Sequence, residues 1–221
     1  MRVLATRYRI PIYTNRSTRA AILETFGSDA PQRAQAITWR VFEPGQSFVA
    51  GDFDIEPFSI PHDASDPVGF LFHHGGRCIA FLTDLGHVTQ LVLEKAKRAD
   101  TLILETNHDV ELLQKDPYRP WSVKQRIGGR HGHLSNETAA QALSQILTDR
   151  LRHIYLSHLS QDCNSPALAE TTIRKKLQEM GATSIQITVA RPDLPCPTQW
   201  MDVHRPVQFE TPPLFGRPPG P

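Results

Sequence analysis

The stretch CIAFLTDLG (residues 78–86) joins an apolar run to an abrupt polar end. Residues 77–84 predict a strand, and Asp84 stands at its carboxyl end. Gly86 is expected to permit a tight turn immediately afterwards. A carboxylate in this position is held by rigid backbone and remains open to a ligand, although aspartate is also an ordinary turn residue.

Two other stretches have the same design. EPFSIPHD (residues 56–63) ends at His62 and Asp63, and HIYLSHLS (residues 153–160) carries His158 just after its apolar run. In layered α/β folds, ligands bind beyond the strand ends, where loops converge. Imidazole nitrogens and carboxylate oxygens together suit zinc, manganese or iron. The alternative for each single residue is a structural or merely exposed side chain.

From residue 87 onward the pattern alternates between helices and strands, which predicts a layered α/β architecture. Before that point short apolar runs are separated by turn residues, and HHGG (residues 73–76) predicts a hairpin, so we expect a mixed sheet. An earlier helix is expected from an N-cap at Ser17 to Phe26, with Gly27 as its stop. The later helices are expected at 88–99, 136–149 and 166–180, and the later strands at 101–105, 153–157 and 184–190.

Bulk composition excludes several classes of protein. The chain has 221 residues and a formal net charge of +1, so no strong charge bias indicates nucleic acid or a membrane surface. No apolar run approaches the length of a membrane span. Three cysteines without paired spacing indicate a reducing compartment, and we expect a cytoplasmic protein. Ten histidines are many for this length, and histidine is the commonest metal ligand.

Two histidine-containing clusters follow predicted strands. LILETNHD (residues 102–109) ends a strand at Glu105 and continues with polar residues that could equally cap a helix. GRHGHLSN (residues 129–136) places His131 and His133 on a glycine-rich loop before a helix, where a histidine could donate a proton to a leaving oxygen. The alternative is a flexible polar loop. The nearby basic residues Lys124, Arg126 and Arg130 are interpreted as a solvated face rather than a phosphate site.

Five motifs together resemble the metallo-β-lactamase fold, most closely its YycJ-like (WalJ-like) exonuclease branch, which is related to tRNase Z. They follow one another in the order and spacing of that branch over roughly residues 1–190. The resemblance implies an αββα sandwich in the α/β (α+β) class. The motifs are IPHDASDPVGF, FLTDLG, LILETNHDVELL, GRHGHLSNETAA and IYLSHLSQDCNSPALA.

The resemblance also implies roles for individual residues. His62, Asp84 and His158 are expected to bind metal, with Asp84 bridging two ions, and His133 is expected to be the catalytic proton donor. The residues expected to contact substrate are Asn107, His108, Asp109, Ser135, Ser160 and Asn164.

One departure from the family pattern limits these expectations. The main metal motif, His-x-His-x-Asp-His, does not occur in the chain, and MRVLATRYRIPIY (residues 1–13) is similar to the segment that follows it in the branch. We therefore expect an incomplete sandwich that lacks the first strands. We also expect at most weak binding of zinc or manganese, of which the family pattern holds up to two. Residues 1–190 are expected to form the C-terminal part of the domain, and 191–221 a proline-rich irregular tail.

Three functions remain open on the sequence. The first is a phosphodiesterase, a 5′→3′ DNA exonuclease in its full-length form, with DNA as substrate, RNA as the alternative substrate, and a homodimer as a candidate assembly. The second is a hydrolase of lactones, thioesters or small phosphoesters on the same fold. The third is an inactive remnant or binding module, so catalysis by this chain is left uncertain.

Overall fold

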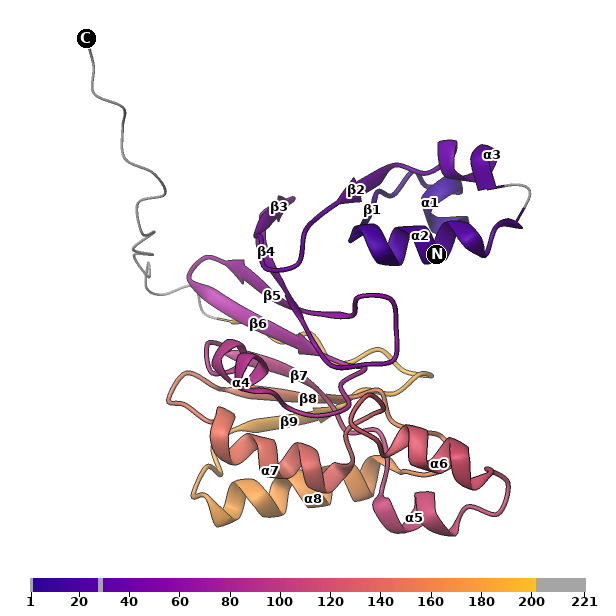
Figure 1. The fold of residues 1–221 in the computed structure, drawn as a ribbon. Helices are drawn as coiled ribbons and strands as arrows, with labels where there is room; N and C mark the ends of the chain where they lie inside the picture. The colour runs from indigo at the N-terminus through magenta and orange to yellow at the C-terminus, as the bar shows by residue number, and fades with distance from the viewer. Residues whose placement is uncertain (1, 28–29, 202–221) are drawn as a thin grey trace.

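A computed structural model describes residues 2–27 and 30–201 of the chain, which are built around a seven-stranded mixed sheet (Figure 1). The strand order is β3-β4-β5-β6-β7-β8-β9, with antiparallel pairing from β3 to β6 and parallel pairing from β6 to β9. These strands are β3 (Phe48–Ala50), β4 (Phe53–Ser59), β5 (Val68–His74), β6 (Arg77–Leu82), β7 (Thr101–Glu105), β8 (His153–Ser157) and β9 (Gln186–Val189).

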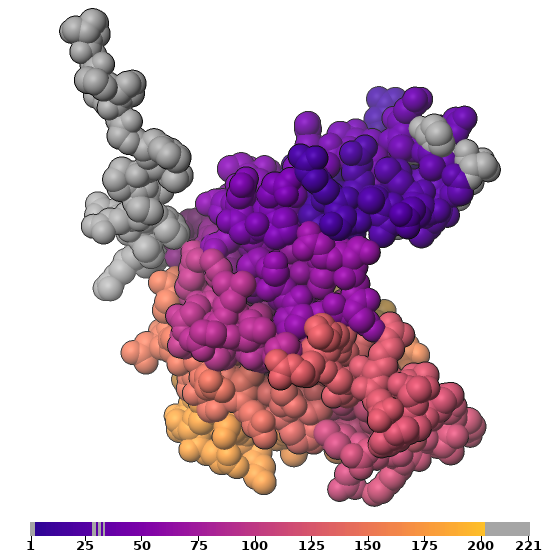
Figure 2. Space-filling model, viewed as in Figure 1, coloured from indigo at the N-terminus to yellow at the C-terminus, as the bar shows by residue number. Residues whose placement is uncertain are grey.

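Besides this sheet, the described residues contain two short strands and eight helices. β1 (Ile12–Thr14) and β2 (Trp39–Val41) form a separate parallel pair. The helices are α1 (Arg2–Arg7), α2 (Arg16–Glu24), α3 (Ala30–Gln35), α4 (Gln90–Ala96), α5 (Val110–Lys115), α6 (Trp121–Ile127), α7 (Asn136–Ile146) and α8 (Pro166–Glu179). The N-terminal segment from α1 to β2 projects from one end of the sheet, and α5 and α6 project from another part of the molecule (Figures 1 and 2).

One face of the large sheet carries the hydrophobic core. Alternate residues of the central strands point to this face, and helices α4, α7 and α8 cover it. In β7, Leu102 and Leu104 are fully buried, and in β8, Ile154 and Leu156 are equally buried. Because β6, β7 and β8 are parallel neighbours in register, their carboxyl ends lie at the same edge of the sheet.

The opposite face is apolar but less covered. The register places Phe70 across from Phe81, and Phe81 keeps 38% of its surface exposed. The strand pair β1–β2 packs at one end of this face through aromatic rings. Phe42, just after β2, lies 5.1 Å from Phe48 and 5.9 Å from Phe70, measured between ring centroids.

Most predicted elements are confirmed, including the mixed sheet, the hairpin at residues 73–76 and the helices α4, α7 and α8. The predicted N-cap at Ser17 is wrong, because the side chain of Asn15 accepts the hydrogen bond from the backbone N–H of Thr18. Helix α6 was not predicted; it has 7 residues and none of them is buried, so it lacks the broad apolar stripe that identifies a core helix.

The predicted irregular tail lies partly within the described residues. Residues 191–201 contain no helix or strand, and the remainder of the predicted tail, 202–221, lies outside the described residues. In the part of the chain that the structure covers, no helix is both long and apolar enough to cross a membrane.

Candidate metal centre

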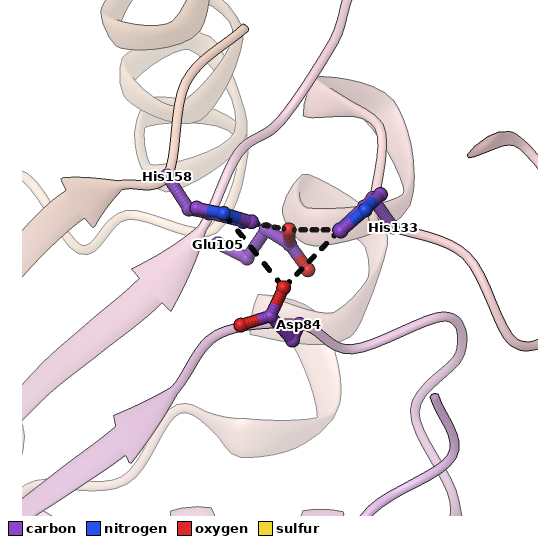
Figure 3. Close-up of side chains that lie close together, drawn as sticks. All are labelled: Asp84, Glu105, His133 and His158. Carbon is purple, nitrogen blue, oxygen red and sulfur yellow. Dashed lines mark hydrogen bonds and ion pairs between the residues drawn. The ribbon is translucent and has the colours of Figure 1, made fainter. Parts of the chain in front are cut away.

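Four side chains able to ligate a metal converge at the carboxyl edge of the parallel strands (Figure 3). One potential ligand atom of each lies within 4.8 Å of those of the others. Asp84 lies two residues after β6 and His158 one residue after β8, Glu105 ends β7, and the fourth residue comes from the loop between α6 and α7. The shared edge explains how residues far apart in the chain meet. The four residues are Asp84, Glu105, His133 and His158.

Glu105 is the buried centre of this group. Its Oε1 accepts hydrogen bonds from Nδ1 of His133 at 2.8 Å and from Nδ1 of His158 at 2.6 Å. Its Oε2 accepts from the backbone N–H groups of Leu85 at 2.7 Å and Leu134 at 3.4 Å. Burial raises the pKa of Glu105, but the hydrogen bonds outweigh it and the net pKa is lowered. The carboxylate is therefore ionised, and both imidazoles donate to it through Nδ1.

This arrangement leaves Nε2 of His158 available for a ligand. That nitrogen lies 3.7 Å from Oδ1 of Asp84. A carboxylate that holds Nδ1–H and orients Nε2 is the usual support of a metal-binding histidine. The hydrogen bond to Glu105 also raises the pKa of His158. Because all the acceptor positions of Glu105 are engaged, we interpret Glu105 as an orienting group rather than a metal ligand.

His62 approaches Asp84 from a different loop. Its Nδ1 donates to the backbone carbonyl of Gly132 at 3.0 Å, so its Nε2 carries the free lone pair. That Nε2 lies 3.6 Å from Oδ1 of Asp84, and the ring centroid lies 5.0 Å from that of His133. The structure therefore brings together all three residues predicted to bind metal, with His133 beside them.

Asp84 and His158 both have left-handed backbone conformations, with φ angles of 54° and 59°. This conformation costs a side-chain-bearing residue about 1–2 kcal/mol and persists only where neighbouring contacts hold it. Asn107 supplies one such contact, because its Nδ2 donates to the backbone carbonyl of His158 at 2.8 Å. The two turns therefore direct the side chains of Asp84 and His158 toward each other.

Two glycines permit the loops of the centre to pack closely. A Cβ atom at Gly86 would lie 2.2 Å from the carbonyl oxygen of Arg130, and one at Gly132 would lie 2.1 Å from that of Ile127. Gly86 was predicted to serve a tight turn, but its φ is not in the left-handed region. The requirement for glycine at 86 is the close approach of the loop that carries His133.

A buried pair of asparagines ties the loops together behind the centre. Nδ2 of Asn136 donates to Oδ1 of Asn164 at 2.9 Å, and Nδ2 of Asn164 donates to Oδ1 of Asn136 at 3.0 Å. Asn164 also donates to the carbonyl of Thr106, next to Glu105. The start of α7 and the loops after β7 and β8 therefore share one hydrogen-bond network.

The residues predicted to contact substrate surround the centre in different settings. Asp109 and Ser135 accept capping hydrogen bonds at the starts of α5 and α7. His108 is buried, and this burial lowers its pKa. Ser160 and Asn164 line a cavity beside His158. Their predicted roles toward substrate remain predictions.

The basic residues near the centre all have protein partners. Arg126 pairs with Asp63 at the mouth of the site. Arg130 lies within hydrogen-bonding distance of His87, and Lys124 donates to two backbone carbonyls that precede α6. The contacts of Arg126 and Arg130 join α6 and the following loop to loops around the centre, whereas those of Lys124 join α6 to the end of α5.

Sequence reasoning did not assign a role to Glu105. Its signal was present, because Glu105 ends an apolar strand in the same way that Asp84 and His158 follow theirs. The sequence does not show that Glu105 lies within hydrogen-bonding distance of His133 and His158, which are 28 and 53 residues away along the chain.

The sequence and the fold are similar to those of known proteins. The β-lactamase superfamily domain family matches residues 1–158. Exodeoxyribonuclease YycJ of Bacillus anthracis is 35% identical over 202 residues, which cover 90% of this chain and 74% of that protein. Exodeoxyribonuclease WalJ of Streptococcus pneumoniae is 36% identical over 177 residues, or 80% of this chain and 64% of that protein. The chain thus spans less than two thirds of the pneumococcal relative.

Solved structures resemble the fold at low sequence identity. The metallo-β-lactamase fold protein YhfI from Bacillus subtilis has a TM-score of 0.58 at 14% identity, covering 85% of this chain and 66% of its own. Zinc-bound PqqB from Methylobacterium extorquens has a TM-score of 0.56 at 17% identity over the same shares. By its family match and its identity to these relatives, the chain belongs to the β-lactamase superfamily, in the branch of YycJ and WalJ, and has the metallo-β-lactamase fold.

Proposed function

We propose that the protein is a metal-dependent phosphodiesterase that degrades DNA from its 5′ end. The observation that carries the proposal is the convergence of Asp84, His133 and His158 around the buried Glu105. The names of the curated relatives, which are exodeoxyribonucleases, support DNA as the substrate.

The donor set suits a divalent metal such as zinc or manganese. His62 and His158 would each offer Nε2, and Asp84 would offer carboxylate oxygen, which is a nitrogen and oxygen set that both metals accept. A divalent ion supplies Lewis-acid polarisation and lowers the pKa of bound water. The buried carboxylate of Glu105 would compensate positive charge in the centre.

His133 is suited to proton transfer. Its Nδ1 hydrogen bond to Glu105 fixes the orientation of the ring, and its Nε2 would then face the leaving oxygen. We assign His133 to protonation of the sugar oxygen that leaves when the phosphodiester is cleaved. Three unpaired cysteines, two of them buried, support a cytoplasmic location for this reaction.

The proposal is tested with 5′-phosphorylated single-stranded oligodeoxynucleotides, the metal-loaded chain, and chelated protein as the control. The expected result is metal-dependent release of mononucleotides from the 5′ end. The same preparation is assayed with a lactone and a thioester. Hydrolysis of either, without cleavage of the oligonucleotide, would contradict the proposal and favour a small-molecule hydrolase.

A further inference from the structure

A second cavity adjoins the metal centre through His158. It has a volume of about 670 Å³ and forms where the loop after β8, the start of α8 and the segment after β9 meet. His158 also lines a smaller cavity of about 250 Å³ that contains His62, Asp84 and His133. A ligand whose reacting group lies at the centre can therefore extend past His158 into the larger space, whose volume is typical of small-molecule sites.

The walls of the larger cavity favour a neutral ring over a charged group. The apolar contacts come from Leu159, Pro166, Ala190 and Pro192, which belong to different segments. Its two charged residues pair with each other, because Arg191 donates to Asp193 at 3.2 Å through Nε and at 3.0 Å through Nη2. A phosphate would need an uncommitted cation or several free N–H groups, whereas a flat apolar face needs neither.

One polar side chain of the cavity is free to recognise a ligand. Ser160 accepts a hydrogen bond from the backbone of Cys163, and Ser165 accepts one from the backbone of Leu168. Within the described residues, Gln161 makes no side-chain hydrogen bond and is exposed at the cavity. An amide both donates and accepts, so it can satisfy the edge of any nucleobase.

We propose that this cavity binds the base of the nucleotide next to the reacting phosphate. The inference rests on the proposed phosphodiesterase function and extends it to a nucleoside subsite. The phosphate lies at the metal centre, the sugar passes His158, and the base packs against Pro166 and Pro192 with Gln161 at its edge. Recognition through a ring face and one amide tolerates any sequence, as an exonuclease requires.

The first test fills the cavity by Ala190→Trp. The backbone N–H of Ala190 already bonds to Leu156, and this bond does not depend on the side chain. The matched control is Leu194→Trp, which adds an indole four residues later at an exposed position that does not line the cavity. Circular dichroism of both variants and their metal content must equal those of the unmodified chain.

Binding of deoxyadenosine 5′-monophosphate and of 2-deoxyribose 5-phosphate is then measured by calorimetry on the metal-loaded chain. The base should improve affinity about tenfold, the effect expected from burying one ring face against apolar side chains. Ala190→Trp should abolish that difference and leave the sugar phosphate unaffected, while Leu194→Trp should retain it. Gln161→Ala should reduce the difference in part. Equal affinities in the unmodified chain, or equal weakening of both ligands by Ala190→Trp, would overturn the subsite.

This measurement separates the subsite from the reaction. A preserved base preference without oligonucleotide cleavage contradicts the phosphodiesterase function and leaves the subsite standing. Cleavage of the oligonucleotide without a base preference contradicts the subsite and leaves the phosphodiesterase function standing. In an active preparation, an abasic residue beside the scissile phosphate should raise KM about tenfold in the unmodified chain and change it little in Ala190→Trp. If KM stays unchanged with an abasic residue on the 5′ side of that phosphate, and also with one on its 3′ side, the subsite would be overturned.

Discussion

The Nδ1 atom of His158 lies 2.6 Å from Oε1 of the buried Glu105. The same oxygen accepts a hydrogen bond from Nδ1 of His133 at 2.8 Å. One carboxylate thus orients two histidines, one suited to hold metal and the other to transfer a proton.

Replacing Glu105 by glutamine should weaken metal binding about 10- to 100-fold, the usual effect of losing the carboxylate that supports a ligating histidine. The amide removes the negative charge and can point an N–H group at the histidines. Calorimetric titration with zinc measures the change. Glu111→Gln, in an exposed pair with Lys115, is the control and should leave affinity unaltered. Unchanged zinc affinity in Glu105→Gln would show that Glu105 does not orient the ligands.

Removing the side chain of His133 by His133→Ala should lower turnover of the oligonucleotide by about 10²- to 10⁴-fold. Metal content, measured by elemental analysis, should stay the same, because the assigned role of His133 is proton donation. His158→Ala is the comparison and should lower both quantities. A loss of metal in His133→Ala would instead identify His133 as a ligand.

The metal-free protein should gain stability from the Glu105–His158 pair between about pH 4.5 and 6.5. The pKa of His158 is raised above its ordinary value of 6.5, so its contribution is present below that value and is lost as pH rises through the raised pKa. The pKa of Glu105 is lowered from 4.5, so its contribution is present above that value and is lost as pH falls through the lowered pKa.

Thermal unfolding of chelated protein from pH 4 to 9 measures this window. His158→Asn should remove the part of the decline above pH 6.5 that the histidine causes. If the Tm profile of His158→Asn runs parallel to that of the unmodified chain across the whole range, the pair makes no pH-dependent contribution.

Adding a methyl group at Gly86 should destabilise the protein by about 1–3 kcal/mol and displace the loop that carries Asp84. The cause is the 2.2 Å approach of the new Cβ to the carbonyl of Arg130. Gly128→Ala is a matched control, because a Cβ at Gly128 meets its nearest atom at 3.6 Å and its φ is −82°. Urea unfolding of both variants tests the comparison, and equal stabilities would contradict it.

Truncating Asn164 to alanine should cost about 1–3 kcal/mol, because the amide of Asn136 and the carbonyl of Thr106 would lose buried partners. Asn136→Ala should have a similar cost. The double variant should lose less than the sum of the two, since each single change already breaks the reciprocal pair. Urea unfolding of all four proteins measures the coupling, and strict additivity would show that the pair contributes nothing jointly.

Much of the fold follows from local pattern. The apolar runs that end at Asp84 and His158 predict buried strands with reactive side chains at their ends, and the structure has strands β6 and β8 there. The polar end of LILETNHD was recognised as a possible helix cap, and Asp109 caps α5, because capping depends on residues three positions apart. Local preference fails at Ser17, where Asn15 caps the helix and also bonds to the distant carbonyl of Asp66.

The sequence by itself determined the later strands of the sheet and which ligand-bearing residues follow them, because alternation and capping act between neighbours in the chain. Only the tertiary structure decided that Glu105 serves both His133 and His158, and that Gly86 must lack a side chain beside Arg130. These relationships depend on strand register and on the approach of loops that are 28 to 53 residues apart. A buried carboxylate becomes an orienting group only when packing brings its partners within hydrogen-bonding distance.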